Sequence, residues 1–413
     1  KTNDLCEKAC GAEDHLTLRS MSELADAYLM FDNYSDSVKI VSKVFEIRKR
    51  LLGEEHLDTL SSMKNLGAAH GMMGNYTEAQ ALNGKSFELH QRLLGPEHPN
   101  TISCMHKLAL NYIGLEQHEK ARDLTEQIVA LRKRVLGPEH PKTLVAMYNL
   151  GIVYRDLMDY DRARALDEQV FMSYKRTVGS EHPMTLSCMH ALAVDYDHLG
   201  QLHTAKNLAE QALELRKKVL GPEHSETLTI TSALSRIYRR LEENENARKL
   251  DEETLAICLK AWGSEHPGTL DTMNDLARDY RRLGQHQIAK ELDEKTLTLR
   301  KKILGPEHKD TLMSMNNLAG DYSDLGEYQK AQELDEETLT LRRRFLGSEH
   351  LDTLLSLNHL ACDYHDLGQY EKSHELQEQL LSLRKKVLGL EHPYTLELMN
   401  ELSAQDSSTN ELA

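Results

Sequence analysis

The sequence predicts an all-α fold, a solenoid of tandem helix-turn-helix units, from two observations. First, the phrase Gly-x-Glu-His-Pro-x-Thr-Leu returns every 42 residues without insertion or deletion, and a fixed period of this length is typical of units that pack only on their neighbours. Second, each unit holds two apolar patterns at helical spacing. The register is marked by Gly11, Gly53, Gly95, Gly137, Gly179, Gly221, Gly263, Gly305, Gly347 and Gly389.

This register divides the chain into nine full units and the start of a tenth. The tenth predicts a capping helix over 389–402, which would cover the last apolar face of the stack, followed by a polar tail over 403–413. Residues 1–10 form an N-terminal remnant, and because Lys1 rather than Met opens the sequence we expect a fragment of a longer protein. The nine units are 11–52, 53–94, 95–136, 137–178, 179–220, 221–262, 263–304, 305–346 and 347–388.

The third unit illustrates how each repeat should fold. Gly95 can take the left-handed conformation that ends the preceding helix, and Pro99 suits the first position of the next one. We expect the first helix from about Pro99 to Leu115 and the second from about Glu119 to Leu136. His98 either caps the first helix or bonds across the linker. Because the Glu-His pair recurs in nine of the ten linkers, and is Glu13-Asp14 only in the first, we interpret it as a folding device and not as a catalytic or metal site.

Small and aromatic residues recur at the positions expected to pack. Leu108, Ala109, Tyr112 and Leu115 share one face of the first helix, and alanine recurs on the second helix at the position of Ala121. In the seventh unit, Tyr280 and Ala289 occupy the tyrosine and second-helix alanine positions, and both are expected to be buried. An arginine in place of Ala289 should therefore be severely destabilising.

The pattern Leu-Ala/Gly-x-x-Tyr followed by Leu-Gly-x-Tyr-x-x-Ala resembles the tetratricopeptide repeat. The 42-residue form, with Leu-Gly-x-Glu-His-Pro at each boundary, resembles the repeats of kinesin light chains and, more closely, the repeat arrays of NLR-like nucleotide-binding proteins. The resemblance covers residues 11–400 and implies a right-handed solenoid whose concave groove binds peptides. No heptad region for a motor partner and no phosphate-binding loop occurs in this sequence, so neither biological role follows from it.

Composition narrows the class of partner. A formal net charge of −16 disfavours a general nucleic-acid or anionic-membrane binder, and no apolar run is long enough to span a membrane. Six cysteines form no disulfide framework, which predicts a reducing, cytoplasmic setting. No catalytic or metal-binding constellation stands out from the repeat background, so we expect neither an enzyme nor a cofactor.

The face of the first helix opposite the packed one is the candidate binding surface, and its character changes along the chain. It is apolar in the third to fifth units, at Leu110, Ile113, Val145, Tyr148, Ile152 and Val194. In the sixth and seventh units it carries six arginines, which we expect to point away from the packed side: Arg236, Arg239, Arg240, Arg278, Arg281 and Arg282. Arginine suits forked contacts to carboxylate or phosphate. The alternatives are that these arginines pair with nearby acids such as Asp271 and Asp279, and that the apolar side chains are partly buried.

The sequence thus predicts a protein-interaction scaffold that binds an extended peptide or a partner domain with an acidic or phosphorylated segment. Within this class a motor cargo adaptor and the sensor region of an NLR-like protein remain alternatives. A nucleic-acid-linked regulator that uses the arginines is a remote third, because aromatic residues are not interleaved with them. The identity of the partner and the oligomeric state do not follow from the sequence.

Overall fold

A computed structural model describes residues 11–31 and 33–411, and over these residues it consists of nineteen helices and no strand. The predicted remnant over 1–10 lies outside the described residues. The helices are α2 (His15–Met30), α3 (Tyr34–Leu52), α4 (Leu57–Met72), α5 (Tyr76–Leu94), α6 (Pro99–Gly114), α7 (His118–Leu136), α8 (Pro141–Asp156), α9 (Tyr160–Val178), α10 (Pro183–His198), α11 (Leu202–Val219), α12 (Ser225–Arg240), α13 (Asn244–Trp262), α14 (Pro267–Arg282), α15 (His286–Leu304), α16 (Lys309–Asp324), α17 (Tyr328–Phe345), α18 (Leu351–Asp366), α19 (Tyr370–Val387) and α20 (Pro393–Glu411). The all-helical prediction is confirmed, and the two helices of the third unit begin and end within one residue of their expected bounds.

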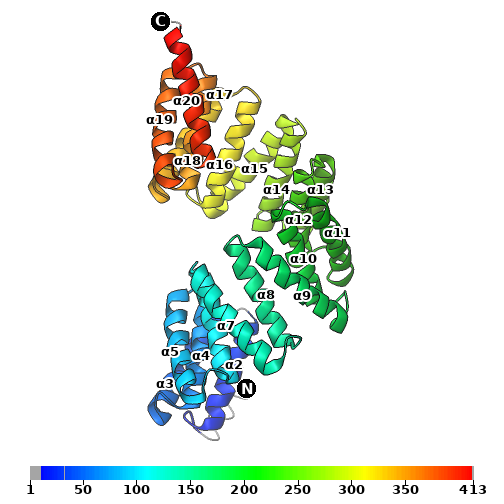
Figure 1. Cartoon of the computed structure of the whole chain (residues 1–413), viewed down its shortest axis with the longest axis vertical. Coiled ribbons are helices and arrows are strands. Elements are labelled where there is room, and N and C mark those ends of the chain that lie inside the picture. The colour runs from blue at the N-terminus through cyan, green and yellow to red at the C-terminus, as the bar shows by residue number, and fades with distance from the viewer. Residues whose placement is uncertain (1–10, 32, 412–413) are drawn as a thin grey trace. The chain divides into compact units, whose positions relative to one another are not determined.

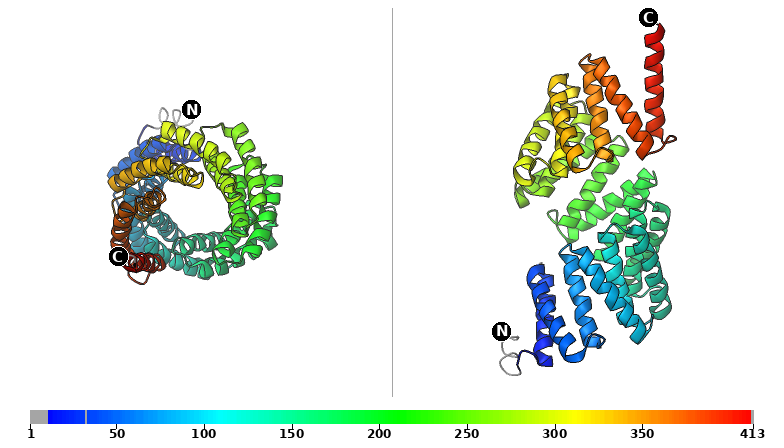
Figure 2. Two further views of the ribbon diagram at one scale, coloured as in Figure 1. Left: turned by 90° about the horizontal axis from the view of Figure 1, so that it is seen from above. Right: turned by 90° about the vertical axis from the view of Figure 1, so that its left-hand side faces the viewer.

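The helices group into two compact bodies, 1–208 and 209–413, and α11 contains the boundary. Within each body the second helix of a unit packs on the first helix of its own unit and on the first helix of the next (Figures 1 and 2). Thus α7 packs on α6 and α8 in the first body, and α15 packs on α14 and α16 in the second. Each internal unit is therefore held in place by its neighbours, as a solenoid requires.

The last helix differs from the prediction. A capping helix was expected to end near Leu402, whereas α20 continues to Glu411. It runs antiparallel to α19, and its last turns extend past the start of α19 (Figures 1 and 2). The physical reason lies in the sequence, because no glycine or proline follows Leu402 to stop the helix. The apolar part of α20 does cover the stack, since Leu398 and Leu402 are buried against α19 and α18 residues such as Leu380 and Leu357.

The linker phrase acts as a helix-capping device. Gly95 takes a φ of 86°, in the left-handed region that ends a helix without steric cost only at glycine. His98 stands just before α6. Its Nδ1 accepts a hydrogen bond from the backbone N–H of Asn100, two residues later, at 3.1 Å and so caps the helix. The capping alternative for the histidine is therefore confirmed. The same cap is formed by His56, His140, His182, His224, His266, His308 and His350.

The glutamate of the linker phrase pairs with a basic residue at the end of the second helix of the same unit. Glu97 pairs with Arg134 in this way, and both side chains are more than half exposed. Surface pairs of this kind contribute little stability individually, about 0–1 kcal/mol. Their value is geometric, because each one ties the two ends of a unit together. The corresponding pairs include Glu13–Arg50, Glu55–Arg92, Glu139–Arg176, Glu265–Lys302 and Glu349–Lys386.

The packing predictions for the seventh unit are confirmed for one residue and wrong for the other. Ala289 is 0% exposed, as expected. Tyr280 is only half-buried, and its hydroxyl donates to Glu252 of α13 at 2.5 Å. A phenol packs its ring and still needs a partner for its polar end. The same bond from a first-helix tyrosine to the preceding second helix recurs at Tyr154–Glu126, Tyr196–Glu168, Tyr238–Glu210, Tyr322–Glu294 and Tyr364–Glu336.

Candidate functional site

Arg239 lies on the packed side of α12 and not on its outer face. Only 4% of the residue is exposed, and Nη1 donates to Asp251 at 3.0 Å and to Asp279 at 2.9 Å. These aspartates belong to α13 and α14, so one guanidinium joins three consecutive helices. A buried guanidinium in contact with two carboxylates is a structural element of the stack and cannot serve a ligand.

The same arrangement occurs around two other arginines. Arg281 of α14 donates to Asp293 at 2.7 Å through Nη2 and to Asp321 at 2.5 Å through Nε. In the first body, Arg155 of α8 donates to Asp167 and, at 3.2 Å, to Asp195. In all three cases the partners lie twelve and forty residues after the arginine. We call each set of one arginine and two aspartates a buried triad.

The expectation that all six arginines point away from the packed side is therefore wrong for Arg239 and Arg281. The alternative of pairing with acids holds for these two, because the repeat places an aspartate on each of the next two helices beside them. Asp279 is one of these partners, whereas Asp271 bonds Arg300 of α15 instead. Reversing the charge of Arg239 would put a glutamate among carboxylates, so it would test folding and not binding.

The other four arginines lie nearer the surface of α12 and α14. Arg236, Arg240 and Arg282 are exposed, and Arg278 is partly buried. Arg278 bonds Asp275 one turn earlier at 3.2 Å, and Arg282 bonds the carbonyl oxygen of Arg239 at 3.3 Å. Contacts of this kind are weak enough to exchange for a ligand. These four define what we call the outer arginine surface of the second body.

The triads also hold protons. Burial raises the pKa of Asp251 to about 8, and burial next to Asp321 raises the pKa of Asp293 to about 8. Asp251 and Asp293 are thus mostly protonated at neutral pH. In the eighth unit Ser323 replaces the arginine and bonds Asp363 at 2.9 Å, and burial raises the pKa of the facing Asp335 to about 8.

The six predicted apolar residues lie on α6, α8 and α10 of the first body. Leu110 is 40% exposed, and the other five are partly buried. Tyr148 packs against the core of this body, which agrees with the alternative of partial burial for that residue. The remaining five, Leu110, Ile113, Val145, Ile152 and Val194, form what we call the apolar surface.

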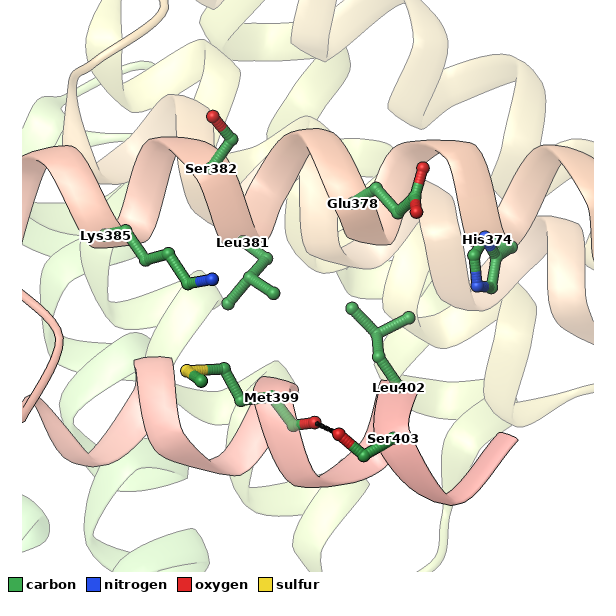
Figure 3. Close-up of a pocket in the computed structure, with 8 residues that line it drawn as sticks. All are labelled: His374, Glu378, Leu381, Ser382, Lys385, Met399, Leu402 and Ser403. Atoms are coloured by element: carbon green, nitrogen blue, oxygen red, sulfur yellow. Dashed lines mark hydrogen bonds between the residues drawn. The ribbon is translucent and has the colours of Figure 1, made fainter. Parts of the chain in front are cut away.

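One cavity lies beside the apolar surface, and another lies between the last two helices. In the first body, a cavity of about 380 Å³ opens between α6, the end of α7 and the start of α8, and Val145 of the apolar surface lines it. In the second body, a cavity of about 450 Å³ lies between α19 and α20. Figure 3 shows Leu381, Met399 and Leu402 pointing into the space between these two helices. Because the buried part of α20 rests on these side chains, we interpret the second cavity as part of the capping contact.

Over residues 11–31 and 33–411 no three His, Cys, Asp or Glu side chains are grouped so as to hold a metal ion. In the same part of the chain, no helix combines the length and apolar character needed to cross a membrane.

Comparison with protein families now identifies the repeat. A model described as tetratricopeptide repeat matches residues 16–86, 72–134, 112–175, 146–218, 198–260, 226–302, 269–344 and 310–386. The chain belongs to the tetratricopeptide repeat family. The match is to a repeat that forms scaffolds and not to a catalytic family. Comparison with curated proteins gives no match.

Solved structures of tetratricopeptide repeat proteins are also similar. A Podosopora anserina protein described as a kinesin light chain with nearly identical repeats is 32% identical, with 49% of this chain and 95% of that chain covered and a TM-score of 0.45. The quorum sensor NprR of B. thuringiensis is 15% identical, with 89% and 98% covered and a TM-score of 0.62. A Pyrococcus horikoshii signal transduction ATPase with a tetratricopeptide repeat sensor is 14% identical, with 90% and 54% covered and a TM-score of 0.58. The last two similarities concern the fold alone.

Proposed function

We propose that this tetratricopeptide repeat array is a non-catalytic scaffold that binds extended protein segments along its first helices. The observation that carries the proposal is the outward position of side chains that the fold does not need. The apolar surface on α6, α8 and α10 leaves Leu110 40% exposed, and on the outer arginine surface Arg278 and Arg282 bond only Asp275 and a backbone carbonyl oxygen. Apolar side chains and forked cations on a preformed surface favour a segment with apolar and acidic or phosphorylated residues.

The proposal explains why a strongly acidic chain keeps a group of arginines at one place. Outside the triads, arginines on two adjacent helices repel one another, and an anionic segment would relieve that repulsion. Charge complementarity of this kind raises the rate of association and selects the partner. Two of the similar solved structures are described as a quorum sensor and as a signal transduction ATPase with a tetratricopeptide repeat sensor, which is compatible with a binding role.

Reversing the charge of the outer arginine surface tests the proposal. A partner is first captured with the array and identified by mass spectrometry, and its acidic segment is titrated by calorimetry. The triple variant Arg236→Glu, Arg240→Glu and Arg282→Glu should keep its helical content, because all three side chains are exposed. It should lose affinity for the acidic segment by about 1.5–3 kcal/mol for each direct contact, not additively. Wild-type binding should weaken as salt rises, and the variant should lose most of this dependence.

A matched control separates a local site from the effect of net charge. Lys249→Glu, Lys295→Glu and Arg343→Glu make the same change in charge at exposed positions of α13, α15 and α17. This control should bind nearly as well as the wild type. Equal loss in both triple variants would show that only net charge matters, and no loss in either would remove the outer arginine surface from the site.

A further inference from the structure

One arginine near the end of the second helix recurs through the array and is normally bonded within the protein. In the seventh unit, Arg300 bonds Asp271 at 2.6 Å and Ser314 at 2.8 Å, and it is only 1% exposed. Arg342, the equivalent arginine of the eighth unit, likewise donates to Ser356, which holds the same repeat position as Ser314. A guanidinium out of water is stable only when such partners satisfy its charge and its donors.

Arg132 is the equivalent arginine of the third unit, and both partners have been replaced. Ser103 stands where the seventh unit has Asp271, and Ala146 of the fourth unit stands where the eighth unit has Ser314. Nη1 of Arg132 donates to the carbonyl oxygen of Lys142 at 2.7 Å, and no carboxylate of the described residues is paired with this guanidinium. Burial lowers the pKa of Arg132, and no neighbouring acid opposes that shift. Arg132 is thus a half-buried cation without an internal counter-ion.

This cation lines the 380 Å³ cavity of the first body. The remaining walls are mostly apolar, and the one acid in the lining, Glu97, is paired with Arg134. His106 also lines the cavity, and burial together with Arg132 and Lys107 lowers its pKa to about 4. It is therefore neutral at pH 7. The apolar walls are Pro99, Ile102, Val135, Leu136, Pro141 and Val145.

We propose that this cavity binds the carboxyl-terminal residue of a partner chain when that residue is apolar. The guanidinium would take the terminal carboxylate, and the apolar walls would take the side chain. This inference rests on the proposed function and specifies the chemistry of one subsite within it. A terminal residue carries an apolar side chain and a carboxylate on the same α-carbon, which matches a small cavity with apolar walls and one unpaired guanidinium. The forked geometry of arginine fits a carboxylate in two parallel hydrogen bonds.

The test uses peptides of known sequence and variants that supply or remove the counter-ion. The probe is a fluorescein-labelled hexapeptide of glycine and serine that ends in leucine with a free carboxylate. Two control peptides identify which carboxylate is bound. One ends in leucine amide and has no carboxylate, and the other also ends in leucine amide but carries a glutamate side chain just before it. Binding is followed by fluorescence anisotropy on the full chain. We expect the free acid to bind at least tenfold more tightly than either amide.

Ser103→Asp restores the carboxylate that Arg300 has in the seventh unit, so it should fill the site from within and abolish the preference for the free acid. Its thermal midpoint should equal or exceed that of the wild type, which shows that lost binding is not lost folding. Thr229→Asp is the matched control, since Thr229 holds the same position in the sixth unit, where Cys258 stands in place of the arginine. This control should keep the preference. Arg132→Gln should lose it, and Arg132→Lys should keep part of it.

Three results would overturn the inference: equal binding of acid and leucine amide, tighter binding of the internal-glutamate peptide, or an unchanged preference in Ser103→Asp. None of these would affect the outer arginine surface, which the triple variant on α12 and α14 tests independently. Failure of the proposed function and failure of this subsite are therefore distinguishable.

Discussion

Replacing Ala289 by arginine should unfold the repeats on both sides of it. Ala289 is 0% exposed on α15, and α15 packs on both α14 and α16. Overpacking a filled site costs about 1–3 kcal/mol, and an arginine without a counter-ion adds an unpaired buried charge that costs several kcal/mol more. Since each unit is held by its neighbours, the damage should divide the array into two blocks of unequal stability. Urea unfolding followed by circular dichroism should then show two transitions in place of one.

The control for this substitution is Ala261→Arg, which adds the same side chain at an exposed position of α13 in the same body. It should leave the unfolding curve close to that of the wild type. A single cooperative transition with an unchanged midpoint in Ala289→Arg would show that this alanine is not part of the core.

Removing the guanidinium of Arg239 should cost about 3–5 kcal/mol, because it leaves buried carboxyls without their cation. Arg239→Met keeps an unbranched, apolar stem and removes the guanidinium with its charge and donors. The effect should depend on pH. The folded pKa of Asp251 is about 8, above its ordinary value of 3.8, so its contribution to stability is complete below about pH 4 and is lost as pH rises through 8. Without the cation this loss grows, and the variant should be weaker at about pH 8.5 than at pH 5.

Asp279→Asn in the same background should recover part of the lost stability, because it removes the second carboxyl of the triad. Arg236→Met on the same helix serves as the exposed control and should change the free energy of unfolding by no more than about 0.5 kcal/mol. If Arg239→Met costs the same at both pH values, or no more than its control, the triad does not support the stack.

The helix bounds could be predicted from the sequence because the signals are local. Gly95, His98 and Pro99 act within a few residues of where they stand, through the glycine conformation, the histidine cap and the proline start. The end of α20 was predicted too early because no local signal marks it. The polar residues after Leu402 were taken for a tail, but polar composition alone does not end a helix. Tyr280 was expected to be buried because it holds the packed tyrosine position, but only Tyr154 and Tyr364 of these tyrosines are buried and Tyr280 is half-buried.

The triads illustrate where the sequence-based prediction of the site failed. A helical wheel of α12 alone separates two faces. It does not show that α13 and α14 each place an aspartate beside Arg239. The signal was present in the aligned repeats, where Arg155, Arg239 and Arg281 are each followed by aspartate after twelve and forty residues. Recognising it requires knowledge of which helices touch.

The cavity at Arg132 could not be predicted for a similar reason. Its character comes from two replacements, Ser103 and Ala146, that lie on different helices from the arginine. Each is unremarkable in its own segment. Only the bonds of Arg300 in the structure show what the third unit lacks.

Hydrogen–deuterium exchange with the captured partner should show whether partners bind along the first helices. We expect slower exchange on binding in α6, α8 and α10, in α12 and α14, or in both groups, while α7, α9, α13 and α15 change little. The exchange of Ala289 and its neighbours on α15 provides the internal reference, since these amides lie on a second helix. Protection confined to the second helices would contradict the account.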